Sequence, residues 1–213
     1  MSVHHPDTYA LFARTLEELL GRWPIRGVIW DELKALKEAD YSPAAREALA
    51  GRDLADPAVH AEAQVAFFGR LNAAIKAAKP DAVTSCFVYG NMADEPWLEL
   101  VAGMDRLDEF GLDGRPWRRT DGGSDDNPGP SAPTKFAPDQ FPAFREAATA
   151  QGRRSLVLVE NHAIDNDDVA LMDRRLPELM AMGPDHLIYY YYPRSVEDPD
   201  AAMAVIGRHL AER

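Results

Sequence analysis

Several segments of this sequence are apolar at consecutive positions rather than at every second one. They read GVIW within residues 25–32, SCFVY within 81–91, VLV within 154–162 and LIYY within 185–192. A strand that keeps one face in water alternates apolar and polar residues, whereas a strand of a parallel sheet covered on both faces is apolar almost throughout. The sequence therefore predicts a parallel sheet with both faces covered.

Stretches with apolar residues at helical spacing separate these runs. They cover residues 7–22, 57–78, 95–104, 138–152, 167–183 and 198–213, and a weaker fifth strand is expected over 105–114. Strict alternation of strand and helix is typical of the α/β class. Two architectures fit this pattern: part of a (β/α)8 barrel with about five strands, or an open doubly wound sheet.

Composition limits the location and the partners of the chain. Its 213 residues include 35 acidic and 23 basic side chains, a net charge of -12. Binding to nucleic acid or to an anionic membrane needs a basic face, so neither is expected. The single cysteine, Cys86, excludes an intrachain disulfide and indicates a reducing compartment. No signal peptide is recognisable in the first ten residues, and we expect a cytoplasmic protein with an inert, buried Cys86 thiol.

A segment over residues 118–136 is rich in Gly, Pro, Asp and Ser. No change of composition occurs across it, so we predict a single α/β domain over residues 1–213. The segment is either a disordered surface loop or linker, or a long loop that caps a site. The second interpretation rests on the rarity of long structureless loops inside compact domains.

Carboxylates follow two of the apolar runs directly. Asp31 and Glu32 end the first strand, and Glu160 ends the fourth. Ligands of parallel α/β folds bind at the carboxyl ends of the strands, where these residues would meet. A pair of carboxylates can cleave a glycosidic bond, one as general acid and the other as nucleophile or base. The alternative is that Asp31 or Glu32 caps the following helix.

Other side chains expected at the same strand ends would bind substrate. They are Tyr89, Asn91, Asp108, Trp117, Asn161, His162, Tyr190 and Tyr192, with Trp30 and Trp97 as further aromatic candidates. Aromatic rings stack on sugar faces, although such rings more often lie in a core. A metal site of Asp31, Asp108, Glu160 and His162 is conceivable, but no His-rich spacing supports it. Phosphate-binding glycine motifs are missing too, so neither a metal nor another cofactor is expected.

The segments GVIWDE after an amphipathic helix, DEFG with the turn DGRPW, and LVLVENH resemble the C-terminal part of glycoside-hydrolase-like (β/α)8 barrels. In the largest retaining clan of these barrels, the acid/base ends strand four and the nucleophile ends strand seven. The resemblance implies that residues 25–32 form strand four and 154–162 form strand seven, with the first three β/α units missing. That clan has Asn before its strand-four Glu, whereas Asp31 precedes Glu32 here, which leaves open which of the two is the acid.

The resemblance implies a glycosidase in which Glu32 or Asp31 is the acid/base and Glu160 the nucleophile, acting on a carbohydrate. Two alternatives stay open: a metal-dependent hydrolase or isomerase on the same strand ends, and a carbohydrate-binding barrel remnant without activity. Exposed sheet edges would permit homo-oligomers. Alternate side chains of a strand point to opposite faces, so two of the four tyrosines at 189–192 must face the helices and two the barrel interior. The sequence does not show which pair faces which side.

Overall fold

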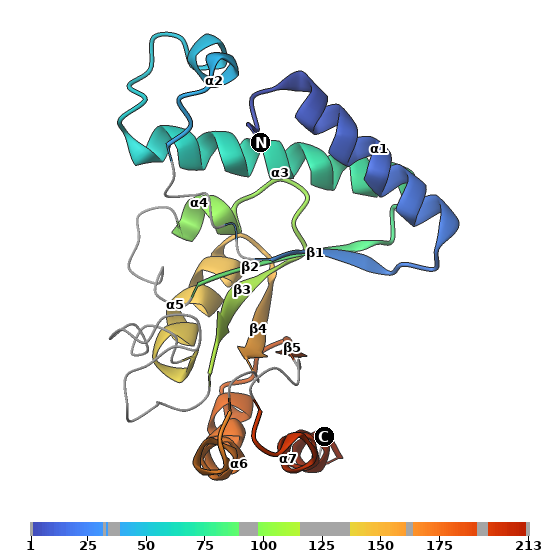
Figure 1. The fold of residues 1–213 in the computed structure, drawn as a ribbon, viewed down its shortest axis with the longest axis vertical. Helices are drawn as coiled ribbons and strands as arrows, with labels where there is room; N and C mark the ends of the chain where they lie inside the picture. Colours follow the sequence, from blue (N-terminus) through green and yellow to red (C-terminus); the bar gives the residue numbers. More distant parts are fainter. Residues whose placement is uncertain are drawn as a thin grey trace.

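The computed structural model of the protein describes residues 2–31, 33, 39–89, 98–115, 137–160, 164–190 and 196–211. Strands and helices alternate through most of the chain, as Figure 1 shows. The strands are β1 (Gly27–Asp31), β2 (Val83–Tyr89), β3 (Glu109–Gly114), β4 (Arg154–Glu160) and β5 (His186–Tyr190). The helices are α1 (Pro6–Arg22), α2 (Pro43–Ala48), α3 (Pro57–Ala78), α4 (Leu98–Ala102), α5 (Ala137–Ala150), α6 (Asn166–Ala181) and α7 (Pro199–Ala211).

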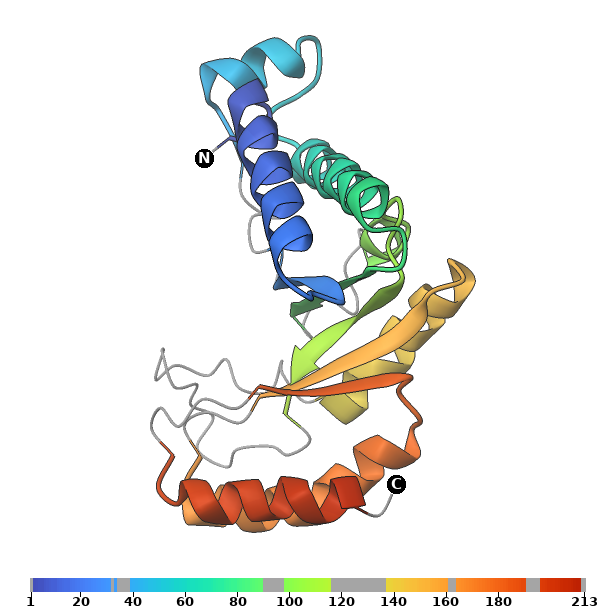
Figure 2. The same ribbon diagram turned by 90° about the vertical axis from the view of Figure 1, so that its right-hand side faces the viewer.

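The five strands form one parallel sheet in the order of the sequence, from β1 to β5. A doubly wound sheet reverses its strand order at a switch point, and this sheet has no such reversal. Right-handed crossovers between successive parallel strands place every connecting helix on the same face. The sheet therefore curls into a half-barrel with its helices outside (Figure 2), which confirms the α/β class and the partial barrel.

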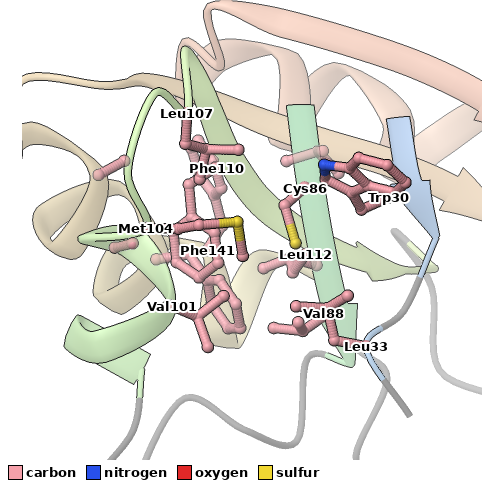
Figure 3. Packing of buried hydrophobic residues seen from close by; sticks show 14 of the residues in the cluster. Trp30, Leu33, Cys86, Val88, Val101, Met104, Leu107, Phe110, Leu112 and Phe141 are labelled. Carbon is pink, nitrogen blue, oxygen red and sulfur yellow. The ribbon is translucent and has the colours of Figure 1, made fainter. Parts of the chain in front are cut away.

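The main core lies between the sheet and these helices. Trp30, Cys86, Val88, Phe110 and Leu112 project from β1, β2 and β3 into it, and Figure 3 shows this packing. Helices α1, α3, α4, α5, α6 and α7 all contribute buried apolar residues. Burying these side chains removes a large apolar area from water, which is the dominant favourable contribution to folding.

The opposite, concave face of the sheet carries a second, smaller apolar cluster. Phe87, Leu156 and Leu158 are buried there, and Ile188 packs against them. These residues alternate along the strands with those of the main core. Both faces of the sheet are therefore apolar in the middle, which is the physical reason for the unbroken apolar runs in the sequence.

The tyrosine at position 189 belongs to the helix side of the sheet. Tyr189 is half-buried and packs against the main core, whereas Ile188 belongs to the cluster on the concave face. Tyr189 therefore faces the helices and not the barrel interior. Residues 191–195 are not among the residues that the structure describes. Among the described residues, no helix is long and apolar enough to cross a membrane.

Candidate active site

The strand ends that carry the predicted catalytic carboxylates lie at the carboxyl edge of the sheet. β1 ends at Asp31 and β4 ends at Glu160, and both strands run in the same direction. Their ends therefore lie at the same edge of the half-barrel. The pairs Asp31–Phe87, Phe87–Gly111 and Gly111–Leu156 place Asp31 level with Leu156 along the strand register. Glu160 thus lies further toward the carboxyl side than Asp31.

Asp31 is exposed at the end of the edge strand. The backbone of Glu160 pairs with that of Tyr190, and the backbone of Tyr89 pairs with that of Asp113. The side chains of Tyr89, Glu160 and Tyr190 are not part of the described structure. Outside it altogether lie Glu32, Asn91, Trp97, Trp117, Asn161, His162, Tyr192 and the segment 118–136.

Asp108 is not at this edge, and its predicted place beside the carboxylates is wrong. β3 begins at Glu109, so Asp108 precedes the strand and lies at the amino edge of the sheet. Its carboxylate accepts hydrogen bonds from Lys76 Nζ at 2.5 Å and from the Thr84 backbone N–H at 2.8 Å. Burial alone would raise the pKa of Asp108, but these donors outweigh it and hold the pKa below its usual range. The Asp108 side chain thus links the start of β3 to β2.

Trp30 is a core residue and does not form a sugar platform. Its side chain is buried on the helix side, and its ring N–H donates to Asn72 Oδ1 at 2.7 Å. The ring also meets Phe68 edge-on, with 5.0 Å between ring centroids. Cys86 is fully buried, as predicted, and burial raises the pKa of its thiol, which disfavours the reactive thiolate.

A polar cluster that the sequence did not reveal lies at the amino edge. The Glu109 side chain is only 1% exposed and forms an ion pair with Arg154. Glu109 Oε2 accepts a hydrogen bond from Ser85 Oγ at 2.6 Å and lies 2.9 Å from His186 Nδ1. Because the active sites of such folds lie at the other edge of the sheet, we assign this cluster to stability. Glu109, Arg154 and His186 each begin an apolar strand, which is the one signal that points to them.

The described residues contain no group of three or more His, Cys, Asp or Glu side chains that could hold a metal ion. The sequence matches no protein-family model and no curated protein.

Proposed function

We propose that the protein cleaves glycosidic bonds in a carbohydrate substrate with a pair of carboxylates at the carboxyl edge of the half-barrel. One observation carries the proposal. Asp31 and Glu160 end the first and fourth strands of a parallel sheet that follows the order of the sequence. This is the same separation as between strands four and seven of a retaining (β/α)8 glycosidase.

Glu160 would be the nucleophile and Glu32, or Asp31 beside it, the general acid. The acid protonates the glycosidic oxygen while the Glu160 carboxylate attacks the anomeric carbon, so the leaving group departs as an alcohol. The glycosyl–enzyme ester is then hydrolysed by water, whose proton goes to the residue that acted first as the acid. Retention requires carboxyl groups about 5–5.5 Å apart, and a larger separation would leave room for the water of an inverting reaction.

Neighbouring strand ends supply candidates for binding and tuning. Tyr190 is the backbone partner of Glu160, which supports it as a candidate for tuning the nucleophile. Tyr89 ends β2, between the two carboxylate-bearing strands. Asn91, Trp117, Asn161, His162 and Tyr192 follow strand ends in the sequence and remain candidates for sugar contacts.

The test is turnover of a panel of nitrophenyl glycosides by the wild type and by Glu160→Gln. We expect the variant to lose turnover by about a thousandfold or more, because an amide cannot form the covalent intermediate. Glu146→Gln, on the exposed surface of α5, is the matched control and should keep full turnover. Glu32→Gln and Asp31→Asn, measured in parallel, identify the acid by the larger loss with poor leaving groups.

Three results would contradict the proposal. Turnover by Glu160→Gln at the wild-type rate would remove its nucleophile. Activity lost to a chelator and restored by a divalent ion would favour the metal-dependent alternative. A wild type that turns over no substrate, yet binds oligosaccharides equally well as Glu160→Gln, would favour a carbohydrate-binding protein without catalysis.

A further inference from the structure

Most exposed large apolar side chains of the described residues belong to the elements at the two ends of the half-barrel. On the β1 side they are Leu11, Phe12, Leu19, Trp23 and Ile29, and on the β5 side Met203 and Leu210. Of the large apolar side chains exposed in the described ranges, only Tyr41 lies elsewhere. The exposed fractions reach 61% for Trp23 and 49% for Leu210. Single exposed apolar residues are ordinary, but a concentration at both ends of one sheet indicates a contact surface.

Along α1 these residues form a continuous ridge. Leu11, Thr15 and Leu19 follow at intervals of four along α1, the spacing of the ridges through which helices pack, and the C-cap residue Trp23 follows four positions after Leu19. Thr15 does not interrupt the ridge as a polar residue, because its hydroxyl donates to the carbonyl of Leu11 at 2.9 Å. At the start of the helix, Leu11 also lines a groove of about 610 Å³ together with Pro43 and Ala44. The ridge therefore continues into a hollow between α1 and α2.

The strands at these ends are open as well. β1 and β5 are the outermost strands, and within the described residues each pairs with a neighbour on one side only. Unpaired edges of this kind invite another strand. Helix α1 lies beside α3 on the β1 side, and α7 lies beside α6 beyond β5, as Figures 1 and 2 show. In the part of the chain that the structure describes, each end of the half-barrel thus has an unpaired strand edge and a helix with exposed apolar side chains.

We propose that two copies of the chain associate end to end, with α7 and the β5 edge of one copy against α1 and the β1 edge of the other. All strands are parallel, so a two-fold rotation about the barrel axis brings β5 of each copy beside β1 of its partner in parallel orientation. The same rotation places the Met203 and Leu210 surface of one copy on the α1 ridge of the other, at both junctions. One operation thereby covers both edges and closes the ring.

The charge of the chain gives this association a specific salt dependence. Each copy carries a net charge of -12, so two copies repel each other over long range. Salt screens that repulsion while leaving an apolar contact intact or strengthening it. We expect the dimer to tighten as salt rises, whereas an association held by ion pairs would loosen.

The experiment measures mass by sedimentation equilibrium for the full chain and for three variants. Trp23→Glu places a charge on the α1 ridge and Met203→Glu places one on α7. Thr149→Glu adds the same charge to exposed α5, over the middle of the sheet. The wild type and Thr149→Glu should be dimers at micromolar concentration, and each edge variant should weaken the dimer by roughly thirtyfold or more. Circular dichroism confirms that every variant is folded.

Mixing the two edge variants separates this arrangement from other dimers. In a mixed pair, one junction carries both substitutions and the other is entirely wild type, so an equimolar mixture should recover association. A dimer in which α1 meets α1 would show no recovery, and that result would overturn the proposal. So would a wild-type monomer at micromolar concentration, or open-ended oligomers, which arise when head-to-tail contacts fail to close.

Discussion

Polar residues of the described chain lie at both edges of the sheet, in different surroundings. At the amino edge, side chains join neighbouring strands: Asp108 binds Thr84, Glu109 binds Ser85, and Asp185 binds Ser155. At the carboxyl edge, the described acidic residues differ in burial: Asp31 is exposed at the end of β1, whereas Asp113 near the end of β3 is buried. A parallel half-barrel can specialise in this way because ligands of such folds bind at one edge only. The other edge is then available to fix the register of the strands.

The same hydrogen-bond arrangement occurs twice at the amino edge. An aspartate directly before a strand accepts hydrogen bonds from the second residue of the preceding strand in the sheet. Asp108 accepts from the backbone N–H and hydroxyl of Thr84, at 2.8 and 3.2 Å. Asp185 accepts from the same two groups of Ser155, both at 2.7 Å. The first links β2 to β3 and the second links β4 to β5.

The largest effect on stability is expected for Arg154→Met. Glu109 is 1% exposed while the Arg154 side chain is 56% exposed, so the two partners are not equivalent. Removing the arginine leaves a buried carboxylate without its cation, which costs about 3–5 kcal/mol. Glu109→Gln leaves an arginine that can turn to water, and should cost about 1–3 kcal/mol. Urea unfolding of both variants measures the difference, and turnover per folded molecule should be unchanged in each.

An equal loss of stability in the two variants would contradict this asymmetry. It would mean that Ser85 and His186 alone compensate the buried carboxylate. A loss of turnover in folded Arg154→Met would mean that the amino edge contributes to catalysis as well as to stability.

A smaller loss is expected for Asp185→Asn. The carboxylate accepts two hydrogen bonds from Ser155, and an amide accepts them less strongly. The free energy of unfolding should fall by about 1–2 kcal/mol. Asp81 precedes β2 at the same edge with an exposed side chain, so Asp81→Asn is the matched control and should change stability little. Similar losses in both variants would show that charge at this edge matters and the hydrogen bonds do not.

The architecture was predictable because it follows from a local pattern. Runs such as VLV and SCFVY are apolar on both faces, and their alternation with helices leaves few topologies. Because these strands are apolar on both faces, the sequence did not show toward which face individual side chains point. In a strand that is apolar on both faces, nothing local shows that Trp30 faces the helices and Phe87 the concave side.

Contacts between distant residues could not be predicted from local patterns. His186 and Glu109 are 77 positions apart, and only the register of β3, β4 and β5 brings them together. The segment DRLDEFGL has apolar residues on either side of its acidic pair, so the sequence alone does not show that the strand begins after Asp108. The catalytic assignment of Glu32, Asp31 and Glu160 stays a prediction.

The smallest effect is a dependence on pH that belongs to the amino edge. The side-chain and backbone hydrogen bonds from Ser155 lower the pKa of Asp185 below its usual range. A depressed pKa stabilises the fold above the unfolded value of about 3.9, and this contribution is lost as pH falls through the folded pKa. Between pH 6 and pH 3 the wild type should therefore lose more unfolding free energy than Asp185→Asn, by roughly 1 kcal/mol or less because the site is partly solvated. Urea unfolding across this range measures the difference in unfolding free energy between the wild type and Asp185→Asn, which should narrow as the pH falls. Asp81→Asn should lose as much unfolding free energy as the wild type. A difference that stays constant with pH would mean that the charge of Asp185 does not stabilise the fold. The aspartates before β3 and β5 would then need a different explanation.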